Sequence, residues 1–224
     1  MDPDVPIGYE IHLGTTCYYF PGANKSFYAS DLHRDVLRNA DLFHFSGPAL
    51  MRSIYRGDGA EMVSILQRVR REGLSTSLDF GLPNARRDAG KVNWQAILPN
   101  ALPLVDVFVT DIAQLLYLLK PETYQGMSVE RGKIKIDALI PSLINQLSEI
   151  VLEYGVKILL IDLGTHGFYL RTNGLKNWEK AGRGLAGLGE AWADREMWAP
   201  ALENKGHENL TGQDAGVAGF LGGL

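Results

Sequence analysis

A carboxylate follows a glycine turn and begins a helix pattern near the C-terminal end of the chain. Asp214 comes two residues after Gly212, and the apolar residues behind it recur at helical spacing. Those residues are Val217, Phe220, Leu221 and Leu224. The first backbone N–H groups of a helix have no partner within it and the helix dipole is positive there, so this turn can bind an anion. The sequence therefore predicts a phosphate-sized anion site beside a carboxylate.

A simpler interpretation gives the same residues a structural role. Thr211 or Asp214 can cap a helix whose glycines allow close packing against a sheet. The order of residues over Thr211–Leu221, however, resembles the signature Thr-Gly-x-Gly-Asp-Ala-Phe-x-Ala-Gly-Phe-Leu of the ribokinase-like (PfkB) sugar kinases. There are two departures from that signature. One residue is missing between Gly212 and Asp214, and Gly216 stands where the family has an aromatic residue.

The resemblance implies a role for each residue of the turn. Asp214 would be the catalytic base that accepts the proton of the attacking sugar hydroxyl. The backbone at Thr211, Gly212 and Gln213 would bind the phosphoryl oxygens of ATP. Loss of one such donor typically lowers a rate by about a hundred- to a thousand-fold. The missing residue therefore predicts weakened catalysis.

A second carboxylate follows the apolar run Val105–Val109. At this point the ribokinase-like family has Asn-x-x-Glu, which helps hold magnesium, commonly through water, and here Asp111 and Gln114 stand at those positions. Aspartate keeps hard oxygen ligands, whereas glutamine removes a charge, so the resemblance implies a weakened Mg²⁺ site. The alternative is that Asp111 only caps the helix that begins there.

Two further segments resemble parts of the same family. The run D-L-G-T-H-G over 162–167 is similar to Lys-Leu-Gly-x-x-Gly, which implies that Gly164 and Gly167 line the nucleotide phosphates. Residues 8–20 are similar to the later half of the small β lid that closes over the sugar, which excludes water. Asp79 alone remains of an Asp-x-Asn-x-Arg-like run, so a role in positioning the nucleotide is not expected there.

The elements that would position these residues alternate along the chain. Strands are predicted over 42–46, 75–79, 105–109, 156–161 and 168–171, and helices over 59–72, 93–98, 112–119 and 137–154. A hairpin is predicted over 8–20, a short helix capped by Ser30 over 31–38, and an exposed glycine-rich loop over 174–189. Strand 42–46 is expected to be buried, with His44 as a packed core residue. The alternation predicts an α/β fold, a mainly parallel sheet with helices on both faces, and ligands bind beyond the carboxyl ends of such strands.

Composition excludes several classes of partner. The 224 residues are 46% hydrophobic and 21% charged with a net charge of −4, and the basic residues are dispersed, so no nucleic-acid partner is expected. A single cysteine, Cys17, rules out an internal disulfide and suits a reducing cytoplasm. No apolar stretch is long enough to span a bilayer and no secretory signal opens the chain, so we expect a cytoplasmic protein without a membrane partner.

Together these features predict one ribokinase-like domain over residues 1–224, incomplete at both ends relative to the family. The family's opening strand and first lid strands have no counterpart here, and the helices and loop that clasp adenine in the family, which would follow Leu224, have none either. The expected function is an ATP-dependent sugar kinase that uses Mg²⁺ and a small-molecule sugar, and the uncovered sheet edge favours a homodimer. The alternative is a catalytically impaired fragment or pseudokinase of the same fold that acts as a binding protein. A dinucleotide-dependent oxidoreductase is disfavoured because no G-x-G-x-x-G follows an early strand.

Overall fold

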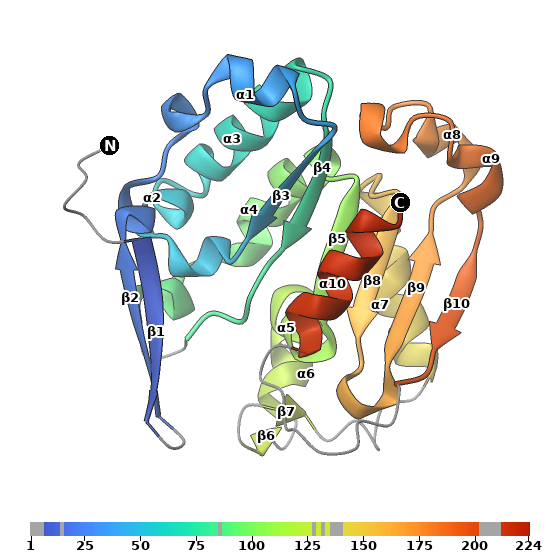
Figure 1. Ribbon diagram of the computed structural model, residues 1–224. Helices are drawn as coiled ribbons and strands as arrows, with labels where there is room; N and C mark the ends of the chain where they lie inside the picture. The colour runs from blue at the N-terminus through green and yellow to red at the C-terminus, as the bar shows by residue number, and fades with distance from the viewer. Residues whose placement is uncertain are drawn as a thin grey trace.

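A six-stranded mixed sheet with helices on both faces forms the body of the molecule (Figure 1). The structure is a computed structural model. It describes residues 7–13, 16–84, 87–126, 129–130, 133–134, 141–201 and 212–224, with the backbone alone at 7–13, 16–21, 129–130, 133–134 and 212–214. The predicted α/β class is confirmed.

The strands follow the order β10-β9-β8-β5-β4-β3 across the sheet. They are β3 (Leu42–Ser46), β4 (Ser75–Asp79), β5 (Val107–Asp111), β8 (Ile158–Asp162), β9 (Phe168–Thr172) and β10 (Glu196–Ala199). Strands β3, β4, β5 and β8 are parallel to one another, whereas β9 and β10 are antiparallel to their neighbours. The mainly parallel sheet is therefore confirmed, and β10 is a strand that the sequence did not predict.

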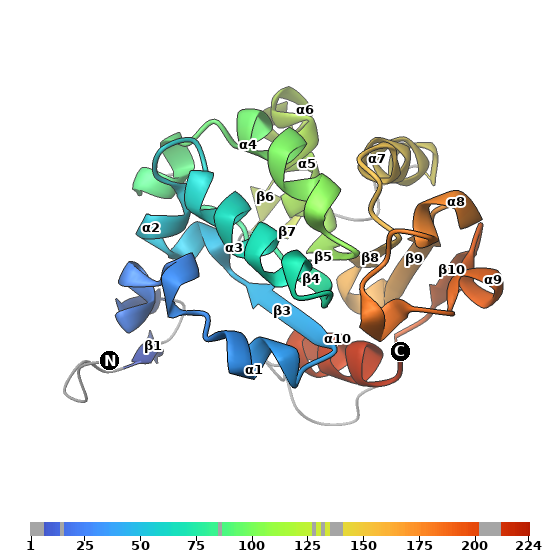
Figure 2. The same ribbon diagram turned by 90° about the horizontal axis from the view of Figure 1, so that it is seen from above.

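Both faces of the central strands are buried, because apolar residues point alternately to the two sides. One set packs with α3 (Ala60–Arg71), α4 (Trp94–Ala101), α5 (Ile112–Leu119) and α7 (Pro141–Glu153) and includes Phe108, Leu159 and Ile161. The other set packs with α8 (Leu175–Trp178) and α10 (Gly212–Gly222) and includes Val107, Val109, Ile158 and Leu160. Figure 2, the view from above, shows α10 on the side of the sheet opposite to α3, α4, α5 and α7.

Shorter elements connect and flank this body. The helices are α1 (Arg34–Arg38), α2 (Arg52–Tyr55), α6 (Pro121–Gly126) and α9 (Gly189–Trp192), and the strands are β1 (Ile7–Leu13), β2 (Thr16–Gly22), β6 (Val129–Glu130) and β7 (Lys133–Ile134). The predicted N-terminal hairpin is confirmed, since β1 and β2 pair antiparallel as a separate two-stranded sheet. In the described part of the chain, the helices are all too short or too polar to cross a membrane.

Most of the predicted strands and helices have the expected bounds to within a few residues. The strand after residue 105 begins and ends two residues later than predicted, so Asp111 is both its last residue and the N-cap of α5. Asn93 caps α4 as predicted, with its Oδ1 accepting a hydrogen bond from the Ala96 N–H at 3.2 Å. The helix predicted from 137 is observed from Pro141, and residues 137–140 lie outside the described residues.

Two predictions in the N-terminal third were wrong. Ser30 caps no helix over 31–38, because the backbone at Leu32 is extended and its carbonyl accepts a hydrogen bond from Arg68 Nε at 2.9 Å. The helix begins only after His33. Strand β3 is the outer strand of the sheet, so it is only partly buried, and His44 is exposed with its Nδ1 3.0 Å from Ser77 Oγ.

The glycine-rich segment 174–189 was also predicted wrongly, because it packs against the sheet and is not an exposed loop. Trp178 and Leu185 are buried on the α10 side. A Cβ atom added at Gly182 would lie 2.1 Å from the backbone nitrogen of Ser75, so only glycine allows this close approach. Arg183 then donates hydrogen bonds to carbonyl oxygens at the ends of α1 and α3, which fixes the segment at the amino ends of the strands.

A buried ion-pair network joins the amino ends of three strands. Asp106, just before β5, is fully buried, and its carboxylate lies 2.9 Å from Arg70 Nη1 and 3.0 Å from Lys157 Nζ. It also accepts hydrogen bonds from the backbone N–H groups of Thr76 at 3.0 Å and Gly182 at 3.4 Å. Burial lowers the pKa of Lys157, and the Asp106 charge partly opposes this effect. The network thus connects α3, β4, β5, β8 and the 174–189 segment.

Candidate functional site

Two carboxylates lie side by side at the carboxyl ends of the central parallel strands. Asp111 ends β5 and pairs in register with Asp162 at the end of β8. Burial raises the pKa of Asp111, and the nearby charge of Asp162 raises it further, while hydrogen bonds from the Gln114 and Ala113 backbone act against this. Such a pair can hold a cation, because carboxylate oxygens are hard ligands and a divalent ion relieves their repulsion.

Gln114 is turned toward the start of its own helix. The Gln114 N–H donates to Asp111 Oδ1 at 2.7 Å, and its side-chain oxygen lies 3.1 Å from Thr110 Oγ1 and 3.4 Å from the Asp111 backbone nitrogen. This reciprocal arrangement is a capping box, so the capping role foreseen for Asp111 is confirmed. The Gln114 oxygen therefore already accepts local hydrogen bonds, and Asp162 supplies the second carboxylate at this edge.

The predicted phosphate-lining turn directly follows Asp162. Gly164 begins a short 3-10 turn with a φ of 62°, and Gly167 ends it with a φ of 90°. Asp162 Oδ1 accepts a hydrogen bond from the Gly164 N–H at 2.7 Å. A Cβ atom at Gly167 would lie 2.0 Å from the carbonyl oxygen of Ala199. The backbone conformation at both positions and the close approach at Gly167 thus require glycine for structural reasons, and a role toward phosphate remains a prediction.

Helix α10 begins at the same edge of the sheet. Gly212, Gln213 and Asp214 form its first turn, and Thr211 lies outside the described residues. A Cβ atom at Gly216 would lie 2.7 Å from Cζ of Phe168, and Phe168 pairs with Asp162 across β8 and β9. The start of α10 is therefore near the Asp111–Asp162 pair, and Figure 1 shows it beside the ends of β5 and β8.

The position of Phe168 also explains the glycine that departs from the family signature. Its ring occupies the space above Gly216 that a side chain at 216 would need. We expect Gly216→Ala to lower the free energy of unfolding by about 1 kcal/mol, because the ring must move to admit the methyl group. Adding Phe168→Leu should cancel part of that loss, which a double-mutant cycle by urea denaturation would measure. Strictly additive effects would show that the two residues do not compete for this space.

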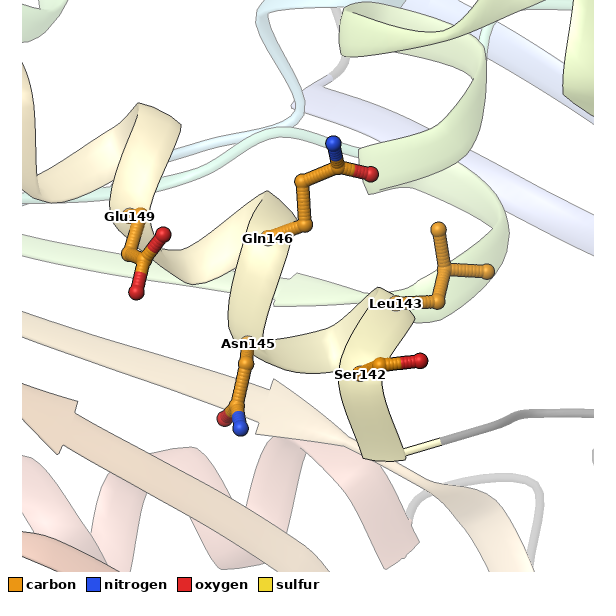
Figure 3. A pocket seen from close by; sticks show the side chains of 5 residues that line it. All are labelled: Ser142, Leu143, Asn145, Gln146 and Glu149. Atoms are coloured by element: carbon orange, nitrogen blue, oxygen red, sulfur yellow. The ribbon is translucent and has the colours of Figure 1, made fainter.

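Two hollows lie on the α7 side of the sheet. One, of about 550 Å³, is bordered only by residues of α7. Figure 3 shows that these side chains point in different directions from a single helix, so they do not converge on a ligand. The other, of about 370 Å³, is lined from α7, the turn after β8, β9 and β10. We call it the Trp198 hollow, and the residues used below are Ile144, Asn145, Leu163, Tyr169, Glu196 and Trp198. Sequence reasoning missed it, because β10 was not predicted.

Tyr169 in this hollow gives the protein a measurable response to alkali. Burial, together with the hydrogen bond from its hydroxyl to Glu196 Oε1 at 2.9 Å, raises the pKa of Tyr169 to about 12 from 10.0. The folded-state pKa lies above the unfolded one, so the stability from the neutral hydroxyl is full below pH 10 and is lost as the pH rises to about 12. Between these pH values, the free energy of unfolding should fall less steeply in Tyr169→Phe than in the wild type. Equal slopes in denaturation series would contradict the assignment.

Within the described residues, no three His, Cys, Asp or Glu side chains gather to hold a metal ion by themselves. The Asp111–Asp162 pair nevertheless suits Mg²⁺, which in nucleotide sites usually binds one or two carboxylates together with phosphates and water. Neither known family profiles nor curated proteins match the sequence.

Solved structures do match. A putative ribokinase II from E. coli in complex with ATP and Mg²⁺ superposes with a TM-score of 0.61 at 15% identity, over 99% of this chain and 60% of its own. A PfkB protein from Polaromonas sp. JS666 gives 0.57 at 14% identity, over 100% and 63%. Arabidopsis thaliana ribokinase complexed with ribose and ATP gives 0.53 at 16% identity, over 93% and 53%. The chain has the ribokinase-like fold.

This ribokinase-like chain spans less than two thirds of the length of each of these three structures. The ribokinase-like fold expected from the resemblance of Thr211–Leu221 is thereby confirmed. With identities of 14% to 16%, the comparisons bear on the fold alone.

Proposed function

We propose that this ribokinase-like domain belongs to an ATP-dependent sugar kinase that transfers the γ-phosphoryl group of ATP to a sugar hydroxyl. The proposal is supported above all by the start of α10 near the Asp111–Asp162 pair at one edge of the sheet. Phosphoryl transfer needs amide donors and cations around the phosphates and a base at the acceptor, and this edge offers the elements for each. Neighbours of the same fold carry ATP with Mg²⁺, or ribose with ATP.

In this proposal each residue of the edge has one task. Asp214, in the first turn of α10, accepts the proton of the attacking hydroxyl. The free N–H groups of Gly212 and Gln213 in that turn, with Thr211 before it, stabilise negative charge on the phosphoryl oxygens.

The other side of the edge holds the remaining phosphate groups. The backbone of the turn from Gly164 to Gly167 contacts the nucleotide phosphates. Asp111 and Asp162 are the carboxylates that hold Mg²⁺, and Gln114 orients Asp111 through its cap. When bound, Mg²⁺ neutralises charge on the phosphate oxygens. The sugar lies between this edge and the β1–β2 hairpin.

The test is direct transfer of phosphate. The purified chain is incubated with ATP, Mg²⁺ and a panel of pentoses and hexoses, and phosphorylated sugar is measured by mass spectrometry. We expect turnover that Asp214→Asn lowers by about 10²- to 10⁴-fold, because the base is lost while the helix turn keeps a polar side chain. Asp58→Asn is the matched control, since Asp58 is an exposed carboxylate in a turn before α3, and it should retain wild-type activity.

Two results would contradict the proposal. Equal activity of Asp214→Asn and Asp58→Asn would remove Asp214 from the chemistry. Binding of ATP by the chain without phosphorylation of any sugar would favour the alternative, a non-catalytic binding protein that keeps the fold. Mass measurement by light scattering in the same samples would test the predicted homodimer.

A further inference from the structure

The Trp198 hollow contains a fixed aromatic surface that faces solvent. Trp198 is 62% exposed, although its indole is held in place by a hydrogen bond from Nε1 to the His166 carbonyl oxygen at 2.7 Å. An anchored aromatic ring loses little further freedom when a ligand stacks on it, and its face attracts cations. Ile144 and Leu163 line the same hollow and extend its apolar wall. This side of the hollow therefore suits a flat apolar group.

On the polar side of the hollow, two acceptor oxygens lie within reach of one hydroxyl donor. The Tyr169 hydroxyl lies 2.9 Å from Glu196 Oε1 and 3.2 Å from Asn145 Oδ1, but its single proton can be donated to only one of them at a time. Glu196 also carries a negative charge. Arg171 of β9 pairs with Glu196 across the two strands, but its side chain donates to the Asn145 backbone oxygen (3.2 Å) and lies 3.5 Å from the Glu149 carboxylate. The corner thus has a place for a cationic donor.

We propose that the Trp198 hollow binds a primary ammonium compound with a flat apolar body. The ammonium group donates to the Glu196 carboxylate and to Asn145 Oδ1, and the apolar body stacks on Trp198 against Ile144 and Leu163. A volume of about 370 Å³ accommodates a ligand with a single ring. The proposal does not depend on phosphoryl transfer, because none of these residues is assigned a part in that chemistry.

The charge requirement can be tested with two ligands of nearly equal shape. The full chain is titrated at neutral pH with benzylamine and with benzyl alcohol by isothermal calorimetry, and the indole N–H signal of Trp198 is followed by NMR. We expect benzylamine to bind about tenfold more tightly than the alcohol, because a charge-assisted hydrogen bond is about twice as strong as a neutral one. Both ligands should shift the Trp198 signal.

Three variants separate the two sides of the hollow. Glu196→Gln should reduce benzylamine affinity about tenfold, to the level of the alcohol, while an amide can still accept from Tyr169. Trp198→Leu should lower the affinity for both benzylamine and benzyl alcohol. Glu190→Gln, an exposed carboxylate on α9 outside the hollow, should change nothing. Circular dichroism confirms folding of each variant. Equal affinities for amine and alcohol, no effect of Glu196→Gln, or no binding to the wild type would each overturn the proposal.

Discussion

Replacing Asp106 by alanine is expected to lower the free energy of unfolding by about 3–5 kcal/mol, the largest effect on stability that we foresee. The substitution leaves Lys157, whose side chain is 4% exposed, without its partner at 3.0 Å. It also removes the acceptor of the Thr76 and Gly182 N–H groups. An unpaired buried charge costs more than the ion pair itself contributes, so most of the expected decrease in the free energy of unfolding comes from the unpaired Lys157. Urea denaturation at neutral pH measures it.

The effect of Asp106→Ala should depend on pH in a defined direction. Burial already lowers the pKa of Lys157 below its usual 10.5, and removing the Asp106 carboxylate lowers it further. Between that lowered value and 10.5, the unfolded chain binds more protons than the folded one, so stability rises with pH. The difference in the free energy of unfolding between Asp106→Ala and the wild type should therefore become smaller at alkaline pH. Asp41→Ala is the control, because the Asp41 side chain is 81% exposed and its ion pair with Arg183 contributes little. If Asp106→Ala lowered the free energy of unfolding by less than about 1 kcal/mol at neutral pH, the Asp106 ion-pair network would be solvated and not buried.

Gly182→Ala is expected to lower the free energy of unfolding by about 3 kcal/mol. The new Cβ atom would lie 2.1 Å from the Ser75 nitrogen and 2.3 Å from the Leu74 carbonyl oxygen. Both are backbone atoms at the start of β4, so they cannot move aside as a side-chain end can. The 174–189 segment must then separate from the sheet, and Gly182 loses its hydrogen bond to Asp106.

The matched control is Gly219→Ala within α10, where an added Cβ atom meets no atom within 4 Å. There the substitution should stabilise the protein by about 0.5–1 kcal/mol, since alanine has the higher helix propensity. The two Gly→Ala variants should thus change the midpoint of thermal unfolding in opposite directions. If Gly182→Ala stabilised the protein, Gly182 could not pack as closely against the Ser75 and Leu74 backbone as described.

The parts of the fold that the sequence predicted well are those with strong local signals. In α3 the four residues at helical spacing, Met62, Ile65, Leu66 and Val69, are all buried, and Gly73 has the positive φ of a C-terminal cap. The buried strands and the Asn93 cap were predicted equally well, because apolar runs and capping residues are signals contained within a few consecutive residues.

The 174–189 segment was mispredicted because its determinants are distant in the chain. Its glycines suggest a loop when only neighbours are considered. They are required because Gly182 contacts Ser75 and Gly184 contacts Asp41, more than a hundred residues away in the sequence. Strand β10 was missed for a related reason, since its four residues are all exposed and show no apolar alternation.

The sequence predicted part of the candidate site, but it did not predict that Asp111 lies beside Asp162. Asp111 was identified at a strand end, and its capping of α5 follows from the sequence alone. Asp111 lies beside Asp162 because β5 and β8 are neighbours in the sheet. About 45 residues separate the two strands in the chain, and no local sequence pattern predicts that they pair. The side of the sheet on which α10 packs likewise depends on contacts between residues distant in the sequence, such as that of Gly216 with Phe168.

The Asp106 network and the Asp111–Asp162 pair lie at opposite ends of the same two strands. Asp111 comes five residues after Asp106, which is about 17 Å of extended chain. Effects of substitutions at sites this far apart usually add. Substitutions that raise thermal stability at the amino ends of these strands can therefore be combined with substitutions at their carboxyl ends, and effects measured separately should add in one chain.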